Sequence, residues 1–297
     1  MKKTHYGIIA CIIGAVTWGF NGVVSQFLLS HYPVAPAWLA AVRMCLAGLL
    51  LTLLALPKKH REIKALLHDP VSVRHLIYFS FGGLLFSQFA YLSGIQHSNA
   101  GTATVLQSLS VVLMSLYLAL RFHKKPTKRE ILSVFLAFGG VYLAATNGNP
   151  ATMVISPLGL AWGLIGAIAC VAYPVLSQGL AARWGAPIVN GLGMLFGGIV
   201  FGGLIRFWTL WPPLDLTGYL ALAFIIVIGT AVSFTTFVAG VGIIGPMKAT
   251  LLGTLEPVVA GILSALVLGT SFQPIEILGY GCIIATVFII VLQKPAA

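Results

Sequence analysis

The sequence predicts an all-α integral membrane protein with ten transmembrane helices, arranged as two inverted repeats of five helices each. Three observations predict this fold class. Only 8% of the residues are charged and 59% are hydrophobic, whereas about 25% of the residues in a soluble domain are charged. The apolar residues form ten runs, and a helix needs roughly 20 residues to cross a bilayer. The two halves of the chain also resemble each other in sequence.

The ten apolar runs are separated by short polar segments, and most of them end near a proline, as helices commonly do. The expected spans are residues 6–29, 36–56, 75–96, 99–120, 131–147, 157–181, 186–209, 217–243, 248–269 and 272–293. The first run is longer than the roughly 7–15 apolar residues of a signal peptide, so we expect it to be retained as a helix. The four cysteines lie inside apolar runs without a CxxC pair, which predicts buried thiols and no metal site.

Basic residues predict the orientation of these helices. If the N-terminus is cytoplasmic, 15 of the 17 Lys and Arg residues fall in cytoplasmic segments, while Arg206 is outside and Arg43 lies within a span. Short cytoplasmic loops are rich in Lys and Arg in membrane proteins. We therefore expect a multi-pass protein of the cell inner (cytoplasmic) membrane with both termini in the cytoplasm. The same distribution accounts for the net charge of +11 without a nucleic-acid partner.

The second half of the chain repeats the first. Residues 94–142 align without gaps onto residues 240–288, at an offset of 146. The first helices of the two halves align at an offset of 152, which brings Ser25-Gln26 onto Ser177-Gln178 and Asn21 onto Tyr173. Several matches in one register, including polar ones, indicate duplication of a five-helix unit.

This duplication predicts the domain organisation. The first five-helix repeat is expected at residues 1–147 and the second at residues 157–297, joined by a short outer linker at residues 148–156. Because five is odd, the second repeat enters the membrane from the opposite side. Inverted repeats of this kind recur in secondary transporters, where they surround a central binding site.

Two charged residues lie well inside the expected spans, where a charge is costly unless it faces a cavity or a partner. Glu256 precedes Pro257 in the ninth span and follows Lys248 by eight residues, about 2.2 helical turns, so the two side chains are expected on one face. We expect Glu256 and Lys248 to act in coupling or gating; the alternative is a carboxylate that pairs structurally. Arg43 is expected to hold a substrate carboxylate, or alternatively to act as a structural clamp.

Polar and aromatic residues in the other spans predict a binding pocket. Gln88 and Tyr91 are three residues apart and share a helix face, and the repeat alignment places them opposite Phe234 and Phe237. This pattern predicts a pocket that is polar on one side and aromatic on the other; the alternative is hydrogen bonding between packed helices. The expected substrate-binding residues are Trp18, Asn21, Arg43, Gln88, Tyr91, Gln107, Tyr173 and Phe237.

The motifs of several other classes of protein are missing from the sequence. It contains no GxxxxGK[ST] phosphate-binding loop, so ATP drive is not expected. No HExxH or GxSxG motif occurs and no carboxylate pair lies in the spans, so we expect neither an enzyme nor a cofactor. A membrane-embedded enzyme or a structural subunit remains the alternative from another class.

With these residues in place, the chain resembles the EamA family of the drug/metabolite transporter superfamily over almost its full length. The resemblance rests on Trp18-Gly19-Phe20-Asn21 in the first span, on Arg43 in the second, and on Leu255-Glu256-Pro257 followed by Gly269 in the ninth. It implies a metabolite transporter that works without ATP hydrolysis. It also implies a central cavity lined mainly by helices one, three, four, six, eight and nine.

Two positions depart from the pattern of that family. Thr270 stands where the family often has Glu, and Ser110-Val111 replaces a proline of helix four. We expect a secondary transporter that exports amino acids or related solutes by alternating access, with a small-molecule substrate, membrane lipid and, as a candidate coupling ion, protons. The alternatives are facilitated diffusion, and uptake or efflux of an organic cation or drug with Glu256 as its counter-charge. The sequence predicts no particular oligomeric state.

Overall fold

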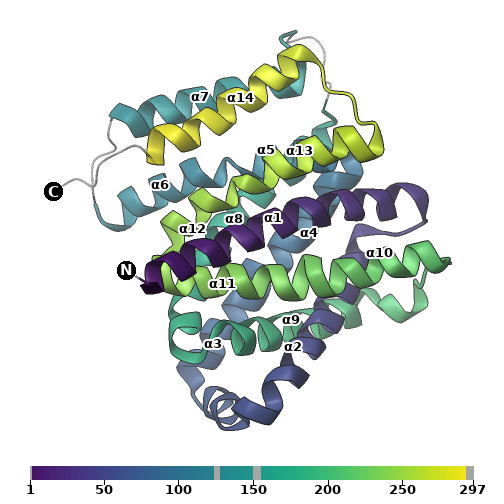
Figure 1. Ribbon diagram of the computed structural model, residues 1–297, viewed down its shortest axis with the longest axis vertical. Coiled ribbons are helices and arrows are strands. Elements are labelled where there is room, and N and C mark those ends of the chain that lie inside the picture. Colours follow the sequence, from purple (N-terminus) through teal and green to yellow (C-terminus); the bar gives the residue numbers. More distant parts are fainter. Residues whose placement is uncertain (1, 124–127, 150–154, 292–297) are drawn as a thin grey trace.

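The computed structural model describes residues 2–123, 128–149 and 155–291, and within these ranges every regular element is a helix (Figure 1). Eight helical segments in this part of the chain are long and apolar enough to cross a membrane. Two shorter apolar helices lie at Ile131–Thr146 and Pro274–Thr286. The structure thus supports an all-helical membrane protein with eight candidate spans.

The first half of the chain contains two long helices followed by two interrupted ones. Its elements are α1 (Lys2–His31), α2 (Pro36–Leu67), α3 (Pro70–Tyr78), the π-helix η1 (Phe79–Leu85), α4 (Phe86–His97), α5 (Ala100–Gln107), α6 (Ser110–Arg121) and α7 (Lys128–Thr146). Asp69 caps the start of α3 and Asn99 caps the start of α5, each through a side-chain oxygen.

The second half follows the same order of intact and interrupted helices. Its elements are α8 (Pro157–Trp184), α9 (Ala186–Ile205), the 3₁₀-helix η2 (Phe207–Thr209), α10 (Leu216–Ile226), the π-helix η3 (Val227–Val232), α11 (Ser233–Ile244), α12 (Pro246–Gly253), α13 (Leu255–Leu268) and α14 (Pro274–Val291). The π-helices η1 and η3 and the breaks at Ser108 and Thr254 fall at nearly equivalent places in the two halves.

The structure differs from the expected spans in two ways. First, α2 does not end at residue 56 but continues through Pro57 to Leu67, with a bend at Lys59 (φ −131°, ψ 23°). Burial of Ile63 and Leu66 explains why this expected loop stays helical. Second, the fourth and ninth spans are each split into two helices.

Part of the expected loops lies outside the described residues. This applies to residues 150–154 of the linker expected at 148–156, to residues 124–127 and to the C-terminal residues 292–297.

Helices from the two halves pack against each other in pairs. The contacting pairs are α2 with α9, α7 with α14, α1 with α11, and α4 with α8. Glycines allow this close approach: a Cβ at Gly198 would lie 2.6 Å from the backbone nitrogen of Cys45, and one at Gly140 would lie 2.7 Å from the Gly279 carbonyl oxygen. The α7–α14 pair lies at one edge and α2 with α9 and α3 toward the other, and α1, α8, α11 and the α5, α12 and α13 segments lie between them (Figure 1).

Candidate functional site

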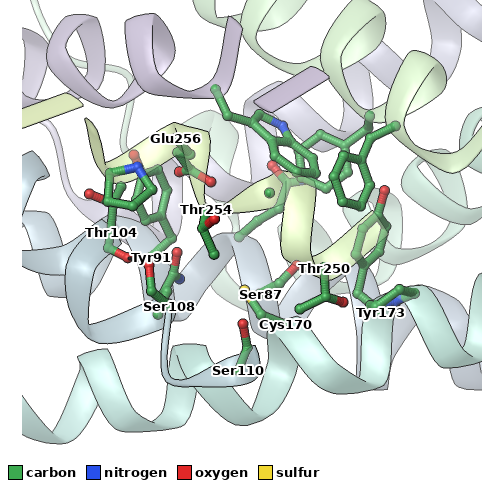
Figure 2. Close-up of a pocket in the computed structure, with 18 of the residues that line it drawn as sticks. Ser87, Tyr91, Thr104, Ser108, Ser110, Cys170, Tyr173, Thr250, Thr254 and Glu256 are labelled. Carbon is green, nitrogen blue, oxygen red and sulfur yellow. Dashed lines mark hydrogen bonds between the residues drawn. The ribbon is translucent and has the colours of Figure 1, made fainter. Parts of the chain in front are cut away.

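A cavity lies where the interrupted helices meet, and it has about 80 Å³ of room for the centres of water molecules (Figure 2). A single water needs roughly 10–15 Å³ by this measure, so the cavity holds several waters or a small solute. Residues of α1, α2, α4, α5, α6, α8, α11, α12 and α13 line it. The cavity is therefore built by both halves of the chain.

The structure brings together all eight residues that the sequence suggested for substrate binding. The cavity is lined by Trp18, Asn21, Arg43, Gln88, Tyr91, Gln107, Tyr173 and Phe237. Glu256 lines it as well. Sequence reasoning missed further lining residues, among them Thr104, Cys170 and Thr250. The repeat offered a signal for them, because Thr104 aligns with Thr250 and Trp18 with Cys170.

Lys248 is the exception among the expected site residues. It is exposed on α12 and is not among the residues that line the cavity. The expected shared face with Glu256 assumed one continuous helix, but α12 ends at Gly253 and α13 begins at Leu255. The Thr254 hydroxyl donates to the Leu251 carbonyl at 2.7 Å and so satisfies a carbonyl at this break. Lys248 therefore does not share the cavity with Glu256.

Arg43 is buried beside the cavity with most of its hydrogen-bonding capacity unused. Its side chain is 1% exposed, and Nη2 donates to the Gln88 carbonyl oxygen at 3.2 Å. Its Nε and Nη1 atoms have no partner in the described part of the chain, and neither has the side-chain amide of Gln88. A buried guanidinium whose donors are mostly without partners is costly. The arrangement therefore suits a planar acceptor such as a carboxylate.

Glu256 supplies a negative charge to the same cavity. It lies half-buried in the first turn of α13, where a helix favours an anion. Glu256 and Arg43 both line the cavity. The ion pairs found at Lys59–Glu62 and Arg183–Asp69 involve neither Arg43 nor Glu256, however. The two charged side chains therefore share one cavity without forming an ion pair with each other, so a third group is able to contact both.

Four aromatic rings, which we call the aromatic cluster, form the other wall: Trp18, Tyr173, Phe234 and Phe237. The Trp18 ring centroid lies 4.8 Å from that of Phe234 and 4.6 Å from that of Phe237. Tyr173 lies 5.5 Å from Phe234 and stacks with Phe237 at 6.0 Å. Such rings bind apolar groups and also cations over their faces.

The two halves contribute different chemistry at equivalent positions. A Cβ at Gly83 in η1 would lie 3.2 Å from the Cα of Tyr173, and one at Gly229 in η3 would overlap the side chain of Asn21. These two contacts correspond in the repeat, because Gly83 aligns with Gly229 and Asn21 with Tyr173. The first half thus supplies an amide where the second half supplies a ring.

This difference gives the cavity a polar end and an aromatic end. Gln88 and Tyr91 of the first half are polar, whereas the equivalent residues of the second half, Phe234 and Phe237, belong to the aromatic cluster. In Figure 2, Tyr91 and Thr104 lie toward one end of the cavity, and Tyr173 lies toward the other. A ligand with one polar end and one apolar end fits this arrangement.

An all-helical membrane fold with an internal cavity that exposes unpaired polar and charged groups defines the class of a membrane transporter. The chain belongs to the EamA-like transporter family, which it matches over residues 5–146 and 157–292. The family resemblance noted in the sequence is therefore confirmed. Membership favours transport over an enzyme or a structural subunit.

Curated relatives agree with this class, and a solved structure shares the fold. The chain is 33% identical to the uncharacterized inner membrane transporter YicL of Salmonella typhimurium over 297 residues, covering 99% of this chain and 98% of YicL. It is 24% identical to the uncharacterized inner membrane transporter YedA of Escherichia coli K12, covering 94% of this chain and 88% of YedA. A solved crystal structure superposes with a TM-score of 0.62 at 18% identity, covering 98% of this chain and 96% of that one. That structural likeness concerns the fold alone.

Proposed function

We propose that the chain is a secondary transporter that exports amino acids or related small solutes by alternating access. One observation carries the proposal: Arg43 and Glu256 line the same cavity as opposite charges that are not paired with each other. An amino acid carries a carboxylate and an ammonium group close together, so it offers a partner to each charge. Its carboxylate would supply an acceptor for Nε or Nη1 of Arg43, neither of which has one in the described chain.

The proposed mechanism uses ten spans in two inverted repeats, at residues 1–147 and 157–297. The pairing of α7 with α14 supports adding these two helices to the eight longer spans. The start of α1 and the end of α14 lie on the same side of the molecule, as an even number of spans requires (Figure 1). The distribution of basic residues supports a cytoplasmic location for both termini.

Glu256 is the proposed coupling residue. A carboxyl group inside the membrane that also contacts the substrate site is able to exchange a proton for the substrate's ammonium group. Export coupled to protons then depends on protonation of Glu256 from one side and its deprotonation on the other. Facilitated diffusion is the alternative, and in that case Glu256 only binds the substrate.

Transport of an organic cation or drug is the second candidate. The observation that favours it is the aromatic cluster next to Glu256, because rings and a carboxylate together bind quaternary and aromatic cations. Arg43 argues against it, because its positive charge in the same cavity repels a cation that has no acidic group. We therefore place amino acids first.

Counterflow into proteoliposomes tests these proposals. Liposomes that contain the purified protein and an unlabelled candidate solute are mixed with a labelled trace of that solute, and empty liposomes serve as the control. We expect uptake of label with amino acids, and little uptake with the corresponding amines, which lack the carboxylate. Uptake of amines or quaternary ammonium ions without uptake of amino acids would overturn the amino-acid proposal in favour of the cation candidate.

A further inference from the structure

A similar contact joins the two halves of the chain at each end of the helix bundle. At the end of α1, the Tyr32 hydroxyl donates to Asp215 at 2.5 Å, just before α10. At the end of α8, Trp184 Nε1 donates to Ser72 at 2.9 Å, and Ser72 in turn donates to the Asp69 carboxylate before α3. Trp184 aligns with Tyr32 at the offset of 152, and Asp215 with Asp69 at the offset of 146. These contacts therefore form a frame that recurs at both ends, and at the α8 end Arg183 adds an ion pair with Asp69 at 2.7 Å.

A second contact is present at one end only. The Gln26 Oε1 atom accepts a hydrogen bond from the backbone N–H of Ala100 at 2.8 Å, and Gln26 Nε2 donates to the Thr270 hydroxyl at 3.5 Å. Ala100 is the first residue of α5, and the first N–H groups of a helix lack partners within that helix. Gln26 thus joins α1 to the start of α5 and to the segment after α13. We call this set of three residues the Gln26 clasp.

The equivalent clasp is missing at the other end. Gln178 aligns with Gln26, but it is exposed and forms no hydrogen bond with the described part of the chain. Pro246 aligns with Ala100 and starts α12 as Ala100 starts α5. Proline has no backbone N–H, so the second half cannot form this bond with the same atoms.

We propose that the Gln26 clasp is a gate, and that the structure represents the transporter closed at this end. The frame recurs at both ends and is supplemented at the α8 end by the exposed Arg183–Asp69 ion pair, whereas the clasp is present at the α1 end alone. Opening the cavity at this end requires α1 to separate from α5 and from the segment that follows α13, which breaks both bonds of Gln26. With the N-terminus in the cytoplasm, this gate faces outward. The proposal rests on alternating access, but not on the identity of the substrate.

Cys170 provides a reporter for the gate because it lines the cavity. The experiment uses the full chain with Cys11, Cys45 and Cys282 replaced by serine, in right-side-out and inside-out membrane vesicles. A membrane-impermeant thiol reagent then modifies Cys170 at a rate that measures access to the cavity from each side. Measuring the rate of Cys170 modification requires no substrate, so failure of the gate proposal is distinguishable from failure of the proposed substrate.

Three variants separate gating from folding. Gln26→Ala removes both bonds and should raise the rate of Cys170 modification from the outer side roughly two- to tenfold, the range expected for losing a typical neutral hydrogen bond. Gln26→Glu keeps an acceptor for the Ala100 N–H, so its rate should stay close to that of the parent protein. Gln178→Ala is the matched control at the equivalent position, and its outer rate should not rise.

Each departure from this pattern would count against the gate. The proposal fails if Gln26→Ala elutes as folded protein and its outer rate equals that of the parent. It also fails if Gln178→Ala raises the outer rate as much as Gln26→Ala does. An increase seen only in inside-out vesicles would overturn the outward location of the clasp.

Discussion

Replacing Arg43 with lysine tests the proposed carboxylate site most directly. Lysine keeps the positive charge but cannot present two parallel N–H groups to a carboxylate. In the structure, Nε and Nη1 are the unpartnered atoms, while Nη2 is occupied by the Gln88 carbonyl oxygen. The substitution therefore removes N–H groups that the guanidinium leaves available to a substrate.

The expected size of the effect follows from the kind of bond lost. A hydrogen bond between charged groups contributes about 1.5–3 kcal/mol, which corresponds to an apparent affinity roughly 10- to 150-fold weaker, at 1.4 kcal/mol per factor of ten. Binding is measured by competition in the counterflow assay, and thermal unfolding in detergent checks that the variant is folded.

A substrate analogue supplies the control for this experiment. The amine that lacks the carboxylate should bind weakly to the parent protein, and the Arg43→Lys substitution should change its affinity little, because the lost bond was never formed. If Arg43→Lys is folded and binds the amino acid within threefold of the parent affinity, Arg43 is a structural residue and the carboxylate site lies elsewhere.

Three further predictions concern the coupling residue, the packing of the site and the outer frame. Glu256→Gln removes the charge and keeps the shape, so proton-driven accumulation should be lost while counterflow persists; accumulation with the parent pH dependence would exclude Glu256 as the coupling group. Gly229→Ala places a methyl group in the space of the Asn21 side chain, so transport should fall at least tenfold, whereas Gly281→Ala, where a Cβ meets nothing within 4 Å, should have no effect. The Tyr32 hydroxyl and the Gly218 N–H lower the pKa of Asp215. The Asp215 carboxylate therefore stabilises the folded protein at pH values above the ordinary aspartate pKa of about 3.9. This stabilisation is lost as the pH falls through the lowered pKa of the folded state. Thermal unfolding of the parent protein should thus shift more than that of Asp215→Asn between about pH 5 and pH 2, and equal shifts would show that the bond does not stabilise the fold.

Much of the candidate site could be predicted from the sequence, because the duplication relates each residue of one half to an equivalent residue of the other. Gln88 and Tyr91 were candidates as polar residues that share one helix face, the repeat alignment related them to Phe234 and Phe237, and all four line the cavity. The helical period alone was sufficient to place residues within one unbroken helix. The alignment between repeats then related residues on different helices.

Other features depend on tertiary packing that no local pattern specifies. The sequence predicted one continuous helix through Lys248 and Glu256, because Thr254 is not a proline and no glycine in a left-handed conformation marks the break there. The continuation of α2 beyond Pro57 depends on burial of Ile63 and Leu66 against the rest of the protein. The equivalence of Tyr32 and Trp184 was missed because two different side chains form the corresponding contact.

The two ends of the cavity differ, so a solute meets different side chains first when it enters from opposite sides of the membrane. Arg43 lies seven residues inside α2 from Pro36, and Phe237 lies seven residues from the end of α11 at Ile244, so in the proposed orientation the amide-rich end faces outward and the rings face the cytoplasm. A solute that enters from the cytoplasm passes the rings before it reaches the guanidinium, whereas one that enters from outside meets the guanidinium first. Ionic strength screens long-range attraction between charges. Salt should therefore slow capture of an acidic solute from outside more than its capture from the cytoplasm, so the two faces of one binding site would differ in their kinetics even where their equilibrium affinities agree.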